Sequence, residues 1–533
     1  MRTVLLTRQA VAVAAVAGLG VLGISAPAIA SAAARHTAAQ TASHSAVTRS
    51  LASPALPAGE KYACPPAPVG QMRCMSIIRT AAGFGFAALA PGGAPQANGP
   101  YTPTDLRRAY KLTSAASRGG GRTIGIVDAF NDPHANADLK VYRSHFHLPA
   151  CTKSNGCLRI LNQRGKASPL PRADAGWAVE ESLDLDMVSA ICPKCHIVLI
   201  EARNPSDVNL GTAENTAIAR GAKYVSNSWG NAEFGAESTF NHFFNHPGHV
   251  INFASGDLGF GSTYPASLQF VTSVGGTALR HSSNGRGWTE SVWGTSANSP
   301  PDGTASGCSV FEAKPSWQRV DATRANGCQR RTENDAAAVA DPNTGVIIFD
   351  TYQEPGGLEV GGTSASTPII TGIYALAGAP VVNTYPAEYP YLHARNLFDV
   401  TSGVNGQCGT AQAYLCHGIR GFDGPTGLGT PNGTTAFGLR AVRRVTLIDP
   451  GNQTRAHGTP FSLKITGLDT RKVASLHFTE SGLPPGLSIH AIPHSTNGQI
   501  SGTLPSAPGT FHVAITGHDG SASGTTHFTI VVT

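Results

Sequence analysis

The sequence predicts two parts: an α/β domain with a mostly parallel sheet covered by helices on both faces, followed by a small all-β sandwich. Between residues 100 and 440, short apolar runs such as Thr123–Val127 alternate with helical patterns such as Trp177–Ala190. From residue 445 to residue 533, apolar and polar residues alternate in short runs, as in Phe461–Ile465. Turns rich in Gly, Pro, Asn and Ser separate these runs, which is typical of an antiparallel sandwich.

The elements of both parts follow from local patterns. A first helix is expected to end at Leu112, with Thr104 or Asp105 as its N-cap. Further helices are expected at Ala135–Phe146, Trp177–Ala190, Leu210–Arg220 and Thr367–Ala377, and strands at Thr123–Val127, His196–Ile200, Tyr224–Ser228 and Val250–Ala254. The α/β domain is expected to close around residues 431–433. In the sandwich, strands are expected at Phe461–Ile465, Phe511–Ile515 and His527–Val532.

Length and composition agree with this division. The chain has 533 residues, more than one compact core normally holds. Gly (61) and Pro (36) are plentiful, which predicts many turns and loops. The net charge of +6 is not gathered into a Lys/Arg cluster, so we expect no nucleic acid among the partners.

The first 30 residues have the pattern of an export signal. Arg2 and Arg8 are basic, Ala10–Ile24 is apolar, and Ala28-Ile29-Ala30 is a small-x-small cleavage pattern. The apolar run is short for a membrane span. We therefore expect a secreted, extracellular protein without stable membrane insertion after signal removal. Residues 31–99 are expected to be a low-complexity leader or a short pro-segment.

The ten cysteines suit an oxidising compartment and lie close together in pairs. Proximity favours five disulfides, although the sequence leaves the connectivity open: Cys64–Cys74, Cys151–Cys157, Cys192–Cys195, Cys308–Cys328 and Cys408–Cys416. The segment from Cys192 to Cys195 has two other interpretations, a redox motif or half of a zinc site. Because no second CxxC pair occurs, a small disulfide loop is preferred.

The most specific chemical signal is the octet Gly361-Gly362-Thr363-Ser364-Ala365-Ser366-Thr367-Pro368, followed by an apolar helix. A serine on a glycine-rich turn at a helix N-terminus has an exposed hydroxyl. Free backbone N–H groups and the helix dipole stabilise negative charge near it. Ordinary N-capping is the alternative. The full octet is more specific than a cap requires, so Ser364 is the candidate nucleophile.

A nucleophilic serine needs a base, and the sequence offers carboxylates for this role. None of the 19 histidines stands in the His-Gly-Thr helix-start context of a Ser-His-Asp site. Glu180 and Asp184 lie four residues apart on an expected helix, so their carboxyl groups share one face. In a partly buried cleft the two would share a proton, and Glu180 would accept the serine proton. A solvated acidic face is the alternative, but apolar residues such as Leu183 adjoin the pair.

Asp257 follows the expected strand Val250–Ala254, in the loop Ser255-Gly256-Asp257-Leu258-Gly259. A protonated aspartic acid there can donate a hydrogen bond to an oxyanion. The alternative is ordinary turn chemistry, in which Asp-x-Gly is common.

These motifs resemble the sedolisin family, the serine-carboxyl peptidases with a subtilisin-like fold. The resemblance runs from about Tyr101 to Gly433, with its motifs in the family's order. It implies that Ser364 is the nucleophile, Glu180 the general base and Asp184 its partner. Asp257 would be the oxyanion residue, and Asp128, where subtilisin-like enzymes have their triad Asp, would be non-catalytic. The implied activity is hydrolysis of protein or peptide substrates through an acyl-enzyme at acidic pH.

The resemblance also implies a substrate cleft and one structural Ca²⁺ ion. The segment Val225–Gly230 would line the cleft, with Ser228, Trp229 and Gly230 the most exposed to peptide. The calcium ligands would be Asp399, Val400, Ile419, Gly421 and Asp423, as carboxylates or backbone carbonyls. Members of the family usually have glycine at the position of Ile419. A Gly/Asp turn without a metal is the alternative.

Two features fall outside this pattern. Sedolisins usually carry a large folded pro-domain, whereas only a leader up to about Pro100 is available here, which leaves self-processing open. Residues 445–533 resemble an immunoglobulin-like module of bacterial surface proteins, which would serve adhesion through a surface ligand, or spacing, or be a structural appendage. The alternative function for the whole chain is a catalytically silent binding or adhesion protein on a peptidase scaffold.

Overall fold

A computed structural model describes residues 55–80, 86, 99–294, 302–318, 327–439, 444–470 and 475–533. The expected export signal lies outside the described residues, as does most of the leader. No helix in these described ranges is both long and apolar enough to cross a membrane.

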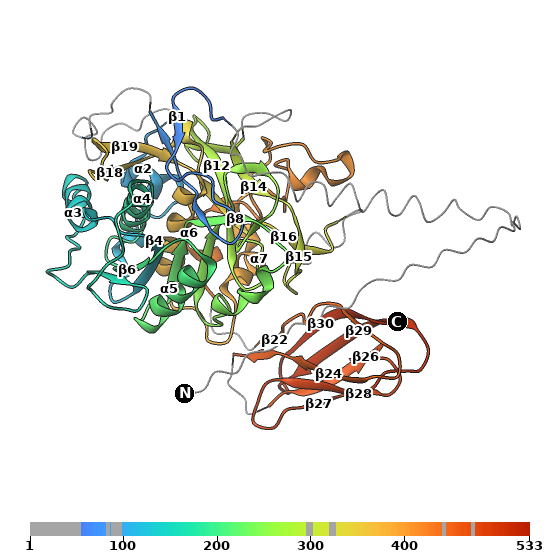
Figure 1. The fold of residues 1–533 in the computed structure, drawn as a ribbon. Helices are drawn as coiled ribbons and strands as arrows, with labels where there is room; N and C mark the ends of the chain where they lie inside the picture. Colours follow the sequence, from blue (N-terminus) through green and yellow to red (C-terminus); the bar gives the residue numbers. More distant parts are fainter. Residues whose placement is uncertain are drawn as a thin grey trace, which may run out of the picture. The chain divides into compact units, whose positions relative to one another are not determined.

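An eight-stranded sheet forms the centre of the α/β domain (Figure 1). Its order is β13-β12-β9-β7-β4-β6-β5, and β17 also pairs with β12. Every pair is parallel except β12–β13 at one edge. The strands are β4 Thr123–Ala129, β5 Leu158–Asn162, β6 His196–Ala202, β7 Tyr224–Asn227, β9 Val250–Ala254, β12 Thr272–His281, β13 Trp288–Val292 and β17 Ala336–Val339.

Helices cover both faces of this sheet, as predicted. On one face, Ile197 and Leu199 of β6 pack in a core with α4 and α6. On the other, Val198 and Ile200 pack with apolar residues of α5. Successive strand residues therefore point to opposite layers, which explains the continuous apolar runs. The helices are α2 Pro103–Ala109, α3 Ala135–His145, α4 Ala175–Ile191, α5 Asp207–Ala219, α6 Thr363–Ala377 and α7 Tyr389–Leu392.

Four helices begin earlier than predicted: α2, α4, α5 and α6. The first helix, α2, begins at Pro103 and is capped by Thr102, which forms a capping box with Asp105. Pro103 suits the first helical position because its missing N–H would be unpaired there anyway. Helix α6 begins at Thr363, so Pro368 lies inside it. The proline leaves the Ser364 carbonyl without an intrahelical partner, and that carbonyl accepts a 3.5 Å hydrogen bond from Ser228 Oγ.

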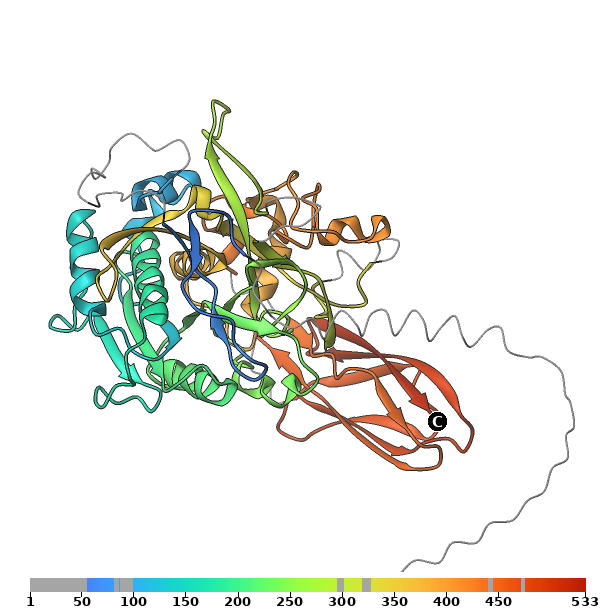
Figure 2. The same cartoon turned by 45° about the horizontal axis from the view of Figure 1, so that its top comes forward.

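Part of the expected leader is ordered as strands against the α/β domain. Strands β1 Glu60–Tyr62 and β3 Ile77–Arg79 pair with each other, and β3 also pairs with β19 Gly356–Gly361, beside β18 Val346–Asp350. Strand β2 Arg73–Cys74 pairs with β8 Trp229–Ala232, which also pairs with β11 Thr263–Tyr264. Figure 2 shows this blue segment crossing the domain beside the green strand β8. Within this expected low-complexity leader, Cys64, Cys74 and Ile77 are buried.

Shorter elements complete the α/β domain. The remaining strands are β10 Leu258–Phe260, β14 Gly303–Ser306, β15 Cys308–Ala313, β16 Arg330–Thr332, β20 Leu397–Phe398 and β21 Thr430–Pro431. The 3-10 turns are Ala115–Ser117, Glu237–Thr239, Asn241–Phe243, Pro342–Thr344, Pro386–Glu388, Ala394–Asn396, Thr410–Leu415 and Thr435–Phe437. All five expected disulfides form, so Cys192 and Cys195 are bonded to each other.

The C-terminal strands form two main sheets around a separate core. One sheet has the order β23-β30-β29-β26 and the other β24-β28-β27, with β22 and β25 as an additional pair. Phe461, Ile465, Ile500 and Ile515 are among the buried residues between them. The strands are β22 Val445–Leu447, β23 Gln453–Arg455, β24 Pro460–Ile465, β25 Gly467–Asp469, β26 His477–Ser481, β27 Leu487–Ala491, β28 Gly498–Thr503, β29 Gly509–His518 and β30 Ser523–Val532.

Candidate active site

Ser364 lies in the first turn of α6, directly after the strand β19. Gly362, the N-cap, has a φ of 99°, a left-handed conformation that favours glycine and allows the sharp strand-to-helix turn. The Ser364 hydroxyl donates a 3.1 Å hydrogen bond to the Ser228 carbonyl and is buried. The turn therefore holds the serine between α6 and the segment that follows β7.

Glu180 and Asp184 project from α4, which contacts α6. Both are fully buried, so the solvated-face alternative is wrong. Asp184 Oδ1 accepts a 2.7 Å hydrogen bond from Ser228 Oγ, and the carbonyl of the same Ser228 accepts from Ser364. Ser228 thus links the acidic helix to the candidate nucleophile, a role that the sequence did not suggest.

Burial controls the protonation of the acidic pair. It raises the pKa of Glu180 well above its ordinary value, and the neighbouring carboxylates of Asp184 and Asp128 raise it further. The hydroxyl of Ser364 partly opposes this rise, although neither Glu180 oxygen has a hydrogen bond of normal geometry. Burial also raises the pKa of Asp184 to about 8, against the hydrogen bond from Ser228. The two carboxyl groups therefore hold at least one proton between them in acid.

Asp257 is fixed to the start of α6 by one of its two oxygens. Its Oδ1 accepts 2.8 Å hydrogen bonds from the backbone N–H and the hydroxyl of Thr363. Its Oδ2 is buried without a hydrogen-bond partner among the described residues, 2.8 Å from the point that a Cβ on Gly362 would occupy. Burial raises the pKa of Asp257 to about 7, so below that pH the free oxygen can carry a proton to donate.

Two further buried carboxyl groups lie near the pair: Asp128, which the resemblance had named as non-catalytic, and Glu201, which the sequence analysis did not name. Asp128 in β4 is fully buried, and burial together with Asp184 and Glu201 raises its pKa well above its ordinary value. Burial raises the pKa of Glu201, in β6, to about 9. The signal available in the sequence was a single acidic residue near the end of each apolar strand run.

Ser228, Trp229 and Gly230, which the resemblance placed in the substrate cleft, are all buried in this structure. The Trp229 ring packs 4.9 Å from that of Phe253, and its Nε1 donates to the Val127 carbonyl. The backbone edge of β8 is paired with residues of the leader. Apolar patterning could not show that this edge is covered by another part of the chain.

The structure brings the expected calcium ligands into one loop region. Asp399 Oδ2 accepts a 3.0 Å hydrogen bond from Gly421 N, and Asp423 Oδ2 accepts one of 3.0 Å from Ile419 N. Burial raises the pKa of Asp423 well above its ordinary value, and the carboxylate of Asp399 raises it further. A divalent cation would relieve this repulsion, and carboxylate and carbonyl oxygens are the ligands that Ca²⁺ prefers. The residues therefore fit such an ion.

A second acidic cluster lies elsewhere and was not predicted. Ligand oxygens of Asp132, Asp138 and Asp350 all lie within 4.8 Å of one another, and all three residues are buried. They come from the turn between β4 and α3, from α3 and from the end of β18. Because Asp350 is far from the other two in the sequence, no local motif indicated a cluster that could hold a metal ion.

Comparison with solved structures identifies the class of fold. Sedolisin from Pseudomonas, in complex with two molecules of pseudo-iodotyrostatin, aligns with a TM-score of 0.53 and 24% identity, over 64% of this chain and 96% of that chain. The domain therefore has the subtilisin-like α/β fold that the sequence predicted.

Within that fold, the sequence is similar to sedolisins. Sedolisin from Pseudomonas sp. (strain 101) is 27% identical over 361 residues, which cover 62% of this chain and 59% of sedolisin. Xanthomonalisin from Xanthomonas sp. (strain T-22) is 34% identical over 209 residues, 34% of this chain and 23% of that protein. Human tripeptidyl-peptidase 1 is 30% identical over 223 residues, 35% of this chain and 36% of that protein. The expected resemblance to the sedolisin family is confirmed.

A family model described as "Putative Ig domain" matches residues 444–533. This match agrees with the strand-rich C-terminal region and confirms its expected resemblance to an immunoglobulin-like module.

Proposed function

We propose that the α/β domain is a secreted serine-carboxyl endopeptidase that cleaves proteins or peptides at acidic pH. The observation that carries the proposal is the convergence of Ser364, Glu180, Asp184 and Asp257 from three separate elements. The resemblance to sedolisins supports the same roles. The catalytically silent alternative would not require four buried, connected groups with this chemistry.

In the proposed reaction, Ser364 Oγ attacks the carbonyl carbon of the scissile peptide bond and its proton passes to Glu180. Asp184 shares the negative charge and proton of the pair, and Ser228 keeps Asp184 in place through its 2.7 Å hydrogen bond. Glu180 then protonates the leaving amine, and water hydrolyses the acyl-enzyme.

The oxyanion is stabilised by the Ser364 backbone N–H and by protonated Asp257. Because burial raises the pKa of Asp257 to about 7, this donor is present in acid and is lost as the pH rises through about 7. Glu180 must still accept a proton, so one member of the acidic pair has to be ionised. The expected profile is a maximum in acid and a fall towards neutral pH.

One Ca²⁺ ion at Asp399, Val400, Ile419, Gly421 and Asp423 is part of the proposal. The ion would neutralise the paired carboxylates and fix the loop. Protein or peptide substrates would be the partners of the α/β domain, and a surface ligand or a spacing role would belong to residues 445–533.

The test is hydrolysis of casein from pH 3 to 8 by the wild type, Ser364→Ala and Glu180→Gln. Acid-peaked hydrolysis is expected in the wild type, with both variants reduced on the order of 10⁴-fold or more. Glu237→Gln is the matched control, because Glu237 is also buried but lies outside the site. Equal activity in wild type and Ser364→Ala would refute the proposal.

A further inference from the structure

One face of the C-terminal sandwich carries four histidines. The strands β26, β29 and β30 pair antiparallel (Figure 1), and residues directly opposite each other share a face of the sheet. Because Val513, Ile515 and Phe528 lie in the core, their neighbours in sequence point away from it. The outer side of these three strands, the histidine face, carries His477, His512, His518 and His527.

The four histidines form two pairs at opposite ends of the face. His477 lies directly opposite His518 in the register of β26 and β29. His527 lies opposite Ala514 of β29 and is therefore the diagonal neighbour of His512. Both arrangements bring side chains within reach of each other. Because a strand rises about 3.4 Å per residue, the two pairs are about 14 to 20 Å apart along β29.

Hydroxyl groups contact the histidine rings and lie between the two pairs. His518 Nε2 is 3.3 Å from Thr479 Oγ1, and His512 Nδ1 is 3.5 Å from Thr529 Oγ1. Between the pairs, the hydroxyls of two threonines on β29 and β30 lie 2.8 Å apart. A hydroxyl group both donates and accepts hydrogen bonds. The histidine face therefore suits a partner that carries acceptors as well as hydroxyl groups of its own.

The charge of the histidine face depends on pH. Histidine is the side chain whose charge ordinarily changes between pH 8 and pH 5. The other outward residues of β26, β29 and β30 are Thr, Ser, Ala and Val, so the face itself has no Asp, Glu, Lys or Arg. The face therefore becomes cationic in acid, the pH range of the proposed peptidase activity.

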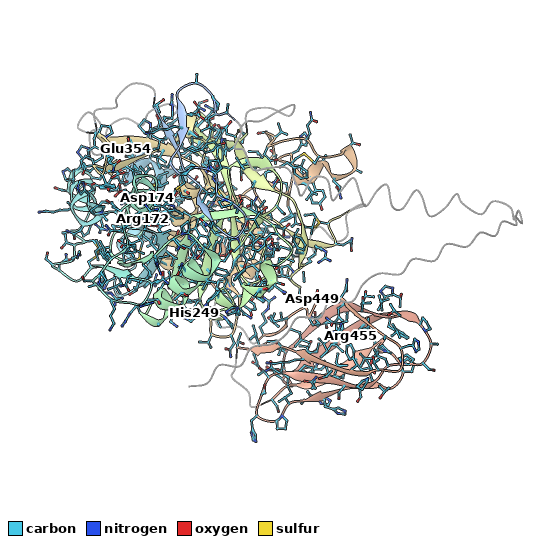
Figure 3. All side chains as sticks on the ribbon, in the orientation of Figure 1. Arg172, Asp174, His249, Glu354, Asp449 and Arg455 are labelled. Atoms are coloured by element: carbon cyan, nitrogen blue, oxygen red, sulfur yellow. A yellow bond between two sulfur atoms is a disulfide. The ribbon has the colours of Figure 1, made fainter. Side chains whose placement is uncertain are left out.

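The charged groups around the face do not neutralise it. The acidic residues of the sandwich lie off the face and are Asp449, Asp469, Glu480 and Asp519. Glu480 and Asp519, which border the face, accept backbone hydrogen bonds within their own turns. Arg455 (Figure 3), on the neighbouring strand β23, adds positive charge at the edge. In acid, two opposed imidazolium rings such as His477 and His518 repel each other, and an anion between them relieves this.

The arrangement of the two pairs selects a partner with repeated negative charge. Only a polyanion reaches both pairs at once, and contact with both strengthens binding. The charge of the partner must also persist in acid. Carboxyl groups begin to gain protons near pH 4, whereas phosphodiesters stay ionised. Nucleic acid fits less well than a polyol phosphate, because the face has no Trp, Tyr, Phe or Arg on which bases could stack.

We propose that the histidine face binds a polymer of polyol units joined by phosphodiesters, in acid, and releases it near neutral pH. The proposal names the ligand class for the surface-binding role proposed above for residues 445–533, on which it rests. Protonated imidazole N–H groups donate hydrogen bonds to the phosphate oxygens. Threonine and serine hydroxyls bond to the polyol units between them. The peptidase is thereby concentrated on the polymer at the pH at which it is active.

The test measures binding of the full chain, carrying Ser364→Ala, to immobilised poly(glycerol phosphate) at pH 5 and pH 8. The dissociation constant is expected to be about tenfold or more lower at pH 5, because both histidine pairs are then charged. Dextran, a neutral polymer, should not bind at either pH. Equal affinity at the two pH values would overturn the proposal. Equal or tighter binding of duplex DNA at pH 5 would overturn the assignment to a polyol phosphate.

Two triple variants separate the histidine face from the charge of the sandwich as a whole. The face variant combines His477→Gln, His512→Gln and His518→Gln. The matched control removes three histidines of the same domain that lie off the face, through His457→Gln, His490→Gln and His494→Gln. Circular dichroism at both pH values checks that the two variants fold alike.

At pH 5 the face variant should bind poly(glycerol phosphate) about tenfold or more weakly than the parent chain, because both pairs are broken. The control variant should bind within about twofold of the parent, because both pairs remain. An equal loss in the two variants would show that net charge alone attracts the polymer and would refute the proposed face. Unchanged binding in the face variant would refute it as well.

The failure of this inference can be told from a failure of the proposed peptidase activity, because binding is measured in a chain that lacks the candidate nucleophile. If the wild type hydrolyses casein in acid while Ser364→Ala does not bind the polymer, the binding face is refuted and the peptidase stands. If Ser364→Ala binds the polymer through the histidine face while the wild type leaves casein intact, the peptidase is refuted and the binding face stands.

Discussion

At the scale of single residues, Asp257 shows most clearly how burial sets the conditions for chemistry. One of its oxygens accepts two hydrogen bonds from Thr363, and the other has no partner in the described ranges. An aspartate in this setting can donate a hydrogen bond only while protonated. Burial raises the pKa of this carboxyl group to about 7. The protonation of Asp257 therefore sets the pH range of the proposed activity.

Asp257→Asn should remove the fall in activity at neutral pH, because an amide donates a hydrogen bond at any pH. Its oxygen can keep the two bonds from Thr363 while its nitrogen takes the place of Oδ2. Asp257→Ala, which lacks any donor, should lose about 10²- to 10³-fold in kcat below pH 7, where the wild type has its protonated donor. The measurement is kcat from pH 3 to 8. A fall near pH 7 that persists unchanged in Asp257→Asn would contradict the assigned role.

The candidate residues could be found from the sequence where the chemistry is local. Glu180 and Asp184 share a helix, and Ser364 is part of a contiguous octet. The link between them could not be found, because Ser228 joins α4 to α6 only in three dimensions. The burial of Trp229 could not be predicted for a related reason: its sequence position gave no sign that its ring packs against Phe253 in the core.

At the scale of elements, α4 carries the acidic pair and depends on its N-terminus for its position. Asp174 (Figure 3) is its N-cap and accepts a hydrogen bond from Trp177 N at 3.3 Å. Asp174→Ala should lower the free energy of unfolding by about 1 kcal/mol, the usual cost of losing such a cap. Urea unfolding in a Ser364→Ala background would measure this without self-digestion.

The control for the cap is Arg172→Ala. Arg172 is exposed and only 3.7 Å from Asp174, so its surface ion pair should contribute less than about 0.5 kcal/mol. If the two substitutions cost the same, the cap is not what holds the start of α4.

The loop that carries Asp399 and Asp423 makes a separate prediction at this scale. Removal of Ca²⁺ by a chelator should lower the Tm, because two neighbouring carboxylates lose the ion that neutralises their charge. Restoring Ca²⁺ should return the Tm, and Asp423→Asn should abolish the response to both treatments. An unchanged Tm on chelation in the wild type would speak against calcium at this loop.

Most elements could be predicted because strands and helices follow periodicity within the segment. Strand β9 has the predicted bounds. Helix α6 starts four residues early because the hydroxyl of Ser228 satisfies the carbonyl that Pro368 leaves free, a contact from outside the segment. The strands between Glu60 and Arg79 were not predicted because they are short and pair with β8 and β19 as well as with each other.

At the scale of the whole molecule, the α/β domain buries several carboxyl groups that are protonated in acid. Burial raises the pKa of Asp184 and Glu214 to about 8, and of Glu201 and Glu237 to about 9. In the unfolded chain these groups titrate near 4. Between pH 4 and 9 the folded state therefore binds more protons than the unfolded state, and stability must fall as the pH rises.

The free energy of unfolding of Ser364→Ala should be largest near pH 4 and fall by several kcal/mol by pH 8, since each unit of raised pKa contributes about 1.4 kcal/mol. Urea unfolding at intervals of one pH unit measures the slope. A stability that is constant or rises over this range would show that these carboxyl groups are ionised in the folded state.

The fold class could be predicted because it depends on the order of elements, whereas clusters assembled across the molecule could not. Asp350 meets Asp132 and Asp138 from a distant part of the chain, and Met75 reaches Ser364 from a segment almost three hundred residues earlier. Such contacts are non-local, and nothing in the composition of either segment encodes the partner.

The most direct test of the central claim is to trap the acyl-enzyme. The wild type is mixed with a peptide ester at pH 4, quenched in acid within a turnover, digested and analysed by mass spectrometry. We predict the acyl mass on Ser364 in the wild type and its absence in Glu180→Gln, with Glu237→Gln labelled like the wild type. Turnover of the ester with no acyl group on Ser364, or with the group on another residue, would contradict the assignment of Ser364 as the nucleophile.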